Sequence, residues 1–119
     1  MGILSKLFKA KESNVSPPAS QAVIVYLDAT NLPQEVYDQY DIATLEDQLI
    51  ERIESGQLGE FDGNEFGAGE VVLYMYGPDA EAIFSGIEQT LLAYPLCKSA
   101  RVVIRRGAPG ADARELQLP

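Results

Sequence analysis

The chain of 119 residues carries 18 Asp and Glu residues against 9 Lys and Arg residues, a net charge of −9, and it contains no His. This length favours one domain that folds without a metal or a disulfide, and without His the chain lacks the commonest general base and zinc ligand. Its negative charge disfavours binding to nucleic-acid phosphates. We therefore expect a protein that is not an enzyme, needs no cofactor and binds no nucleic acid.

The acidic residues are concentrated in the middle of the chain. Residues 21–96 contain fifteen Asp and Glu residues and one basic residue, Arg52, whereas residues 1–20 and 97–119 carry net charges of +2 and +3. Such a field favours a basic protein partner. An alternative explanation is that the charge only keeps the protein soluble.

Residues 1–20 are expected to form a basic amphipathic segment followed by a linker that contains Pro17 and Pro18. The apolar side chains share one helical face, with lysines around it: Ile3, Leu4, Leu7 and Phe8, with Lys6, Lys9 and Lys11. The segment is too short to span a membrane or to act as a signal peptide. We expect no stable membrane anchor, and weak contact with an anionic membrane surface stays an alternative.

The first half of the domain reads as a strand followed by helices. Residues 21–28 are β-branched and apolar on both faces, which predicts a central strand. Asn31 is the expected N-cap of a short helix within residues 30–41. A longer helix is expected to start at Thr44 and to end at Gly56.

The second half reads as a hairpin, a helix and a strand. A weak strand over residues 58–66 and a strong strand over residues 70–76 are joined by a glycine turn. Pro78 and Asp79 are expected to open the next helix, and Pro95 to end it. A last strand follows, and it is expected to cover residues 100–106.

This order predicts an α+β ferredoxin-like fold, βαββαβ, with a four-stranded antiparallel sheet and two helices on one face. The domain is expected to span residues 21–106, with the second and fourth strands at the sheet edges. The tail over residues 107–119 is rich in Gly and Pro and is expected to be irregular, with Leu116 and Leu118 docking back onto the domain.

The sequence around the hairpin resembles a family of small bacterial proteins that carry an EDxLIxxIExxGxGEFDGNE pattern followed by a strand and YGPDA. Here the matching stretch covers residues 45–84, from LEDQLIERIESG through GEFDGNE to YGPDAEAIF. The members of that family have no assigned function, so the resemblance transfers no site residues. It implies a bacterial, cytoplasmic protein.

The acidic hairpin is the first candidate interaction surface. It brings together hard oxygen ligands of the kind that calcium and magnesium prefer, namely Glu60, Asp62, Asn64, Glu65 and Glu70. Their spacing matches no calcium loop, and in a regular strand Glu60, Asp62 and Asn64 share one face while Glu65 lies on the other. A partner surface, a metal site and a solubilising edge strand are the three interpretations.

The sheet face away from the helices is the second candidate surface. It is expected to present Tyr26, Tyr74 and Tyr76 beside apolar side chains, which favours contact with a protein partner or a second copy of the chain. Stacking of RNA bases is the less favoured alternative, and the N-terminal segment or the C-terminal tail are alternative covers. Asp28, at the end of the first strand, is expected to line a small site with Thr30 and Asn31, or simply to cap the turn.

Cys97 has no His to activate it and is expected to act as a small apolar side chain. The favoured hypothesis is therefore a non-enzymatic, protein-binding module of a regulatory or immunity type. The alternative is a domain that binds a small ligand or a divalent metal through the acidic hairpin and Asp28.

Overall fold

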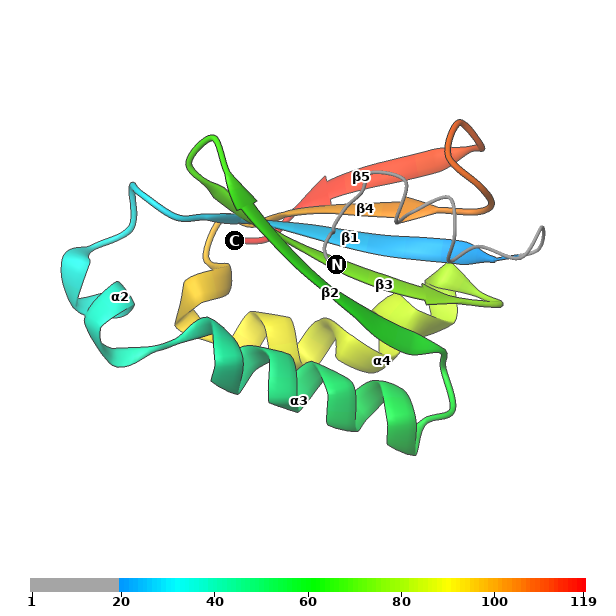
Figure 1. Ribbon diagram of the computed structural model, residues 1–119, viewed down its shortest axis with the longest axis horizontal. Coiled ribbons are helices and arrows are strands. Elements are labelled where there is room, and N and C mark those ends of the chain that lie inside the picture. Colours follow the sequence, from blue (N-terminus) through cyan, green and yellow to red (C-terminus); the bar gives the residue numbers. More distant parts are fainter. Residues whose placement is uncertain (1–19) are drawn as a thin grey trace.

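The computed structural model describes residues 20–119, and it shows an α+β protein built on a five-stranded antiparallel sheet (Figure 1). The predicted amphipathic segment and nearly all of the linker lie outside the described residues. The elements follow in this order: β1 (Gln21–Asp28), α2 (Gln34–Gln39), α3 (Ile42–Ser55), β2 (Glu60–Gly67), β3 (Glu70–Gly77), α4 (Ala80–Ala93), the 3₁₀ turn η1 (Pro95–Cys97), β4 (Arg101–Arg105) and β5 (Ala113–Gln117).

The strand order is β2-β3-β1-β4-β5, so the predicted four-stranded sheet is wrong by one strand. β5 lies within the tail that was expected to be irregular, and it pairs with β4, which is therefore not an edge strand. The physical reason is that apolar and polar residues alternate along the tail. Leu116 pairs with Val102 on the helix-covered face, and Leu118 is 5% exposed in the core. Docking of Leu116 and Leu118 is confirmed: Leu116 lies in β5, and Leu118 follows directly after the end of that strand.

Both long helices begin at an aspartate. Asp79 caps α4, which therefore starts at Ala80 and not at Pro78. The cap of α3 is Asp41 rather than Thr44: its carboxylate accepts a hydrogen bond of 2.8 Å from the Thr44 backbone N–H. Asn31 does not cap α2, which begins after Pro33 without a side-chain cap. α2 is a third helix beside the two that the fold prediction contained.

The core lies between the sheet and the two long helices, which run side by side under one face (Figure 1). Each helix buries an apolar stripe there, which consists of Leu45, Leu49 and Ile53 in α3 and of Ile83, Ile87 and Leu91 in α4. Alternate residues of the central strands meet them, among them Val23, Val25, Leu27, Leu73, Met75, Val102 and Ile104. Cys97 is buried in the same core, and burial raises the pKa of its thiol to about 12.

A cluster of charges ties β5 to α4. Arg114 donates two hydrogen bonds to the Glu81 carboxylate, from Nε at 2.7 Å and from Nη2 at 2.8 Å, and Arg106 donates a third at 3.1 Å. These hydrogen bonds lower the pKa of Glu81 to about 2. The carboxylate therefore stays ionised far below its ordinary range.

Within residues 20–119, no helix combines the length and the apolar composition that crossing a membrane would need.

Candidate functional site

One edge of the molecule is strongly acidic. Residues 34–67, which form α2, α3 and β2, contain ten Asp and Glu residues and a single basic residue, Arg52. β2 is the edge strand on this side and α3 packs beside it. We call the acids of these two elements the acidic edge: Glu46, Asp47, Glu51, Glu54, Glu60, Asp62 and Glu65.

Arg52 is the single basic residue among these acids, and its guanidinium is held toward α4. Its Nε donates a hydrogen bond of 3.1 Å to the backbone oxygen of Gly86 in α4. Asp47, Glu51 and Glu54 of α3 are exposed to solvent. The edge therefore stays negative, because its acids outnumber this one cation.

A β-bulge changes the predicted arrangement of the acidic hairpin. The pairing of β2 with β3 shifts between Phe61 and Gly63, and Gly63 adopts a φ of 128°. Beyond the bulge, Asn64 lies on the helix-covered face, where its amide donates a hydrogen bond to Glu46 of α3. The expectation that Glu60 and Asn64 share one face is therefore wrong, because the extra residue reverses the alternation.

The remaining hairpin residues separate further. Glu65 accepts a hydrogen bond of 2.8 Å from the Tyr74 hydroxyl on the face away from the helices, whereas Glu70 lies 3.7 Å from the Arg101 guanidinium. In the part of the chain that the structure describes, no group of three or more His, Cys, Asp or Glu residues is placed to hold a metal ion.

The face away from the helices carries Tyr26, Tyr74 and Tyr76, as expected from strand alternation. Tyr76 is only 3% exposed, and it forms a small apolar cluster with Ala22 and Ile24. The Arg101 guanidinium lies over the Tyr26 ring, 3.8 Å from its centroid. This face is thus less open than the sequence predicts.

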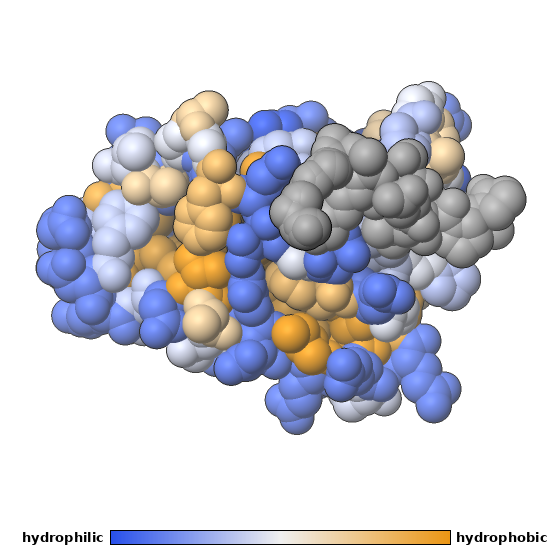
Figure 2. Space-filling model, in the orientation of Figure 1, coloured by the Kyte–Doolittle hydropathy of each residue, from blue (hydrophilic) through white to orange (hydrophobic). Residues whose placement is uncertain are grey.

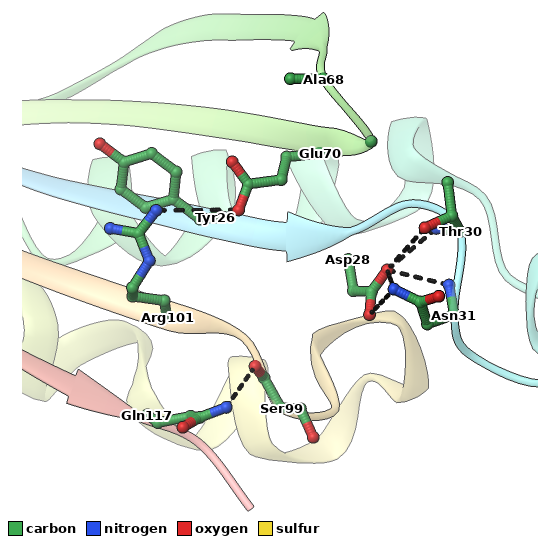
Figure 3. A pocket seen from close by; sticks show the side chains of 10 residues that line it. Tyr26, Asp28, Thr30, Asn31, Ala68, Glu70, Ser99, Arg101 and Gln117 are labelled. Atoms are coloured by element: carbon green, nitrogen blue, oxygen red, sulfur yellow. Dashed lines mark hydrogen bonds and ion pairs between the residues drawn. The ribbon is translucent and has the colours of Figure 1, made fainter.

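A polar pocket of about 390 Å³ opens where the ends of four strands and the β2–β3 turn meet (Figure 3). Asp28 and Glu70 are paired across β1 and β3, and both line it. Thr30 and Asn31 line it as well, as expected from their place after β1.

Hydrogen bonds hold the carboxylate of Asp28 in this pocket (Figure 3). One oxygen accepts from the backbone N–H groups of Thr30 and Asn31, each at 2.9 Å, and the Asn31 amide donates to the other at 3.2 Å. The bond from Thr30 is the main reason that the pKa of Asp28 is lowered, followed by the bond from Asn31. Asp28 therefore both caps the turn and lines the pocket.

Five pocket residues were not predicted as site residues. Ala68 and Gly69 belong to the β2–β3 turn, and the other three come from the β4–β5 side of the sheet. Arg101 begins β4, Gln117 ends β5, and Ser99 precedes β4. The Arg101 guanidinium lies between the carboxylates of Glu70, at 3.7 Å, and Glu115, at 3.6 Å. The signal for Gln117 was the alternation of apolar residues in the tail, which marks β5.

No family model, no curated protein and no solved structure matches the chain. The resemblance of residues 45–84 to a bacterial family therefore stays a prediction. The fold and its surfaces define an acidic α+β protein whose charge is polarised across the sheet.

Proposed function

We propose that this protein binds a cationic protein partner through the acidic edge, as a non-enzymatic module of the regulatory or immunity type. The observation that supports it is the acidic edge, in which seven acids of the neighbouring elements α3 and β2 accompany a single basic residue, Arg52. Arg101, Arg105 and Arg114 lie in β4 and β5, at the opposite end of the strand order, and Lys98 and Arg106 flank β4 in the sequence. Such a polarised field orients a charged partner before contact and raises the rate of association.

The test is a comparison of two double variants with the same change in net charge. Glu51→Lys with Glu54→Lys reverses exposed charges on the acidic edge, near the C-terminal end of α3, where cations suit the helix dipole. Asp112→Lys with Glu115→Lys makes the same change at the β5 side. We expect the first variant to bind an oligolysine peptide roughly tenfold more weakly, because two attractions become repulsions, and the second to bind nearly as the wild type.

Binding is measured by fluorescence anisotropy at low and at high salt, and light scattering reports the oligomeric state. High salt should abolish binding of the peptide, since exposed charges are screened. Equal loss in both variants would mean that only net charge matters, which is the solubility explanation. A pull-down with both variants then tests whether a natural partner uses the same edge.

We also propose that β1, α3, β2, β3, α4 and β4 form a ferredoxin-like unit to which α2 and β5 are added. The order β2-β3-β1-β4 within the sheet supports this assignment. A ferredoxin-like fold hosts many unrelated functions, so this assignment bears on the scaffold and not on the activity.

A second candidate function is the binding of a small polar ligand in the pocket of Figure 3. The volume of this pocket, about 390 Å³, favours this alternative because it is within the range of ligand sites. In a thermal-shift screen of small polar metabolites and divalent cations, we expect a true ligand to raise the melting temperature by several degrees. Arg101→Gln should abolish that shift, whereas Lys98→Gln, with the same loss of charge outside the pocket lining, should retain it. A screen without any such shift would contradict this function.

A further inference from the structure

An apolar cleft of about 240 Å³ lies between α2, the start of α3 and the β2–β3 hairpin. Its apolar lining comes from elements that are far apart in the sequence, and includes Tyr37, Tyr40, Ile42, Phe66, Val71 and Leu96. Figure 2 shows apolar surface in this region of the molecule, with hydrophilic side chains around it. Phe66 is 66% exposed, so its ring is available to a molecule that enters the cleft.

Hydrogen bonds and ring packing fix the walls of the cleft. The Tyr37 hydroxyl donates to the backbone oxygen of Asp28 at 2.9 Å and accepts from the Leu32 N–H at 3.0 Å. The Tyr40 ring packs edge-on against Tyr94, with 5.6 Å between the ring centroids. A cleft with fixed walls loses little entropy when an apolar group enters it.

The rim of the cleft is negative. Asp41 lines it, and residues 29–51 contain no Lys or Arg, whereas Asp28 contributes its backbone because its carboxylate lies in the polar pocket. Hydrogen bonds from Thr44 lower the pKa of Asp41, so this carboxylate stays ionised at neutral pH and below. A cationic segment is therefore the partner whose charge fits an apolar group placed here.

The volume of the cleft limits the size of the group that can bind in it. Sites for whole small molecules measure about 300–1,000 Å³, and this cleft is smaller. We infer that it takes one aromatic or large aliphatic side chain of the cationic partner, flanked in that partner by Lys or Arg residues. This inference rests on the proposed function, and it adds an apolar anchor to an otherwise electrostatic contact.

The experiment compares two oligolysine peptides that differ only in one central residue, Phe or Ala. Their affinities are measured by NMR titration of the full chain, which also shows which resonances move. We expect the Phe peptide to bind wild type about tenfold more tightly, since burial of an aromatic ring adds to the ionic contact, and to shift the resonances of Ile42, Val71 and Tyr40.

The matched variants are Phe66→Ala and Leu92→Ala, because Phe66 and Leu92 are the two exposed large apolar residues of the described chain. Phe66 lines the cleft, whereas Leu92 lies on α4 outside it. Phe66→Ala should remove most of the advantage of the Phe peptide, and Leu92→Ala should keep it. Both substitutions are at the surface and should leave the fold intact.

The outcomes separate this inference from the proposed function. If both peptides bind wild type equally, the cleft inference fails and the proposed function stands; if neither binds, the proposed function fails. An advantage of the Phe peptide that survives Phe66→Ala overturns the cleft as its site. Two controls without peptide would also overturn the inference. Cleft resonances that move on dilution would assign the cleft to a second copy of the chain, and cleft resonances that move on deletion of residues 1–19 would assign it to the chain's own N-terminal residues.

Discussion

Gly59→Ala is expected to lower the free energy of unfolding by about 3 kcal/mol or more, through strain and overpacking together. Gly59 adopts a φ of +147°, which residues with a Cβ rarely accept. A Cβ at this position would lie 2.0 Å from the backbone oxygen of Tyr76 and 2.8 Å from the Cα of Gly77. These are backbone atoms of β3, so the clash cannot be relieved by rotating a side chain.

The control is Gly67→Ala, in the same strand region. A Cβ at Gly67 meets no atom within 4 Å, so this substitution should change stability by no more than about 1 kcal/mol. Urea unfolding of both variants, followed by circular dichroism, measures the difference. Equal midpoints would contradict the close approach of the two backbones.

The same contact positions the candidate site. A Cβ at Gly77 would lie 2.2 Å from the backbone oxygen of Leu58, so both glycines are needed where the chain enters β2. This entry places β2 against β3, and with it the acidic edge beside α3. Gly59 weakens the strand pattern in the sequence, yet it is required for the position of β2 against β3.

Much of the fold was predictable because its signals are local. The apolar stripe of α4, its Asp79 cap and Pro95 after its end all lie within one stretch of chain, as does the two-sided apolarity of β1. β5 was missed because its strand is only five residues long and follows a stretch rich in Gly and Pro. The decisive contact, Leu118 with the core, is formed by tertiary packing.

The candidate site was less predictable than the fold. The acidic segment could be located by counting charged residues, because such a count does not depend on the fold. The bulge at Gly63 places Asn64 on the helix-covered face. A single extra residue of this kind has no clear signature in a sequence. The polar pocket needs Asp28, Glu70 and Arg101 together, and only the pairing of β1 with both β3 and β4 brings them there.

Removal of residues 112–119 is expected to lower the melting temperature by roughly 10 °C or more, which corresponds to a loss of about 2–3 kcal/mol in a domain of this size. The deletion removes Leu118 from the core and Leu116 from its contact with it. It also removes the hydrogen bond of 2.8 Å from the Leu118 N–H to the Ala100 oxygen, and leaves β4 as an unpaired edge. Differential scanning calorimetry measures the change, and light scattering reports aggregation at the new edge.

Two point variants divide this loss into its causes. Leu118→Ala keeps the strand and should account for most of this loss, about 2 kcal/mol, because it leaves a cavity in the core. Arg114→Gln keeps the core and should raise the pKa of Glu81 from about 2 toward its ordinary value of 4.5, as NMR titration can show. Because the folded-state pKa is the lower one, the stabilisation by Glu81 is complete above pH 4.5 and is lost as the pH falls toward 2, so Arg114→Gln should flatten the stability profile in that window.

Unfolding curves that neither the deletion nor Leu118→Ala changes would mean that the tail does not pack as a fifth strand.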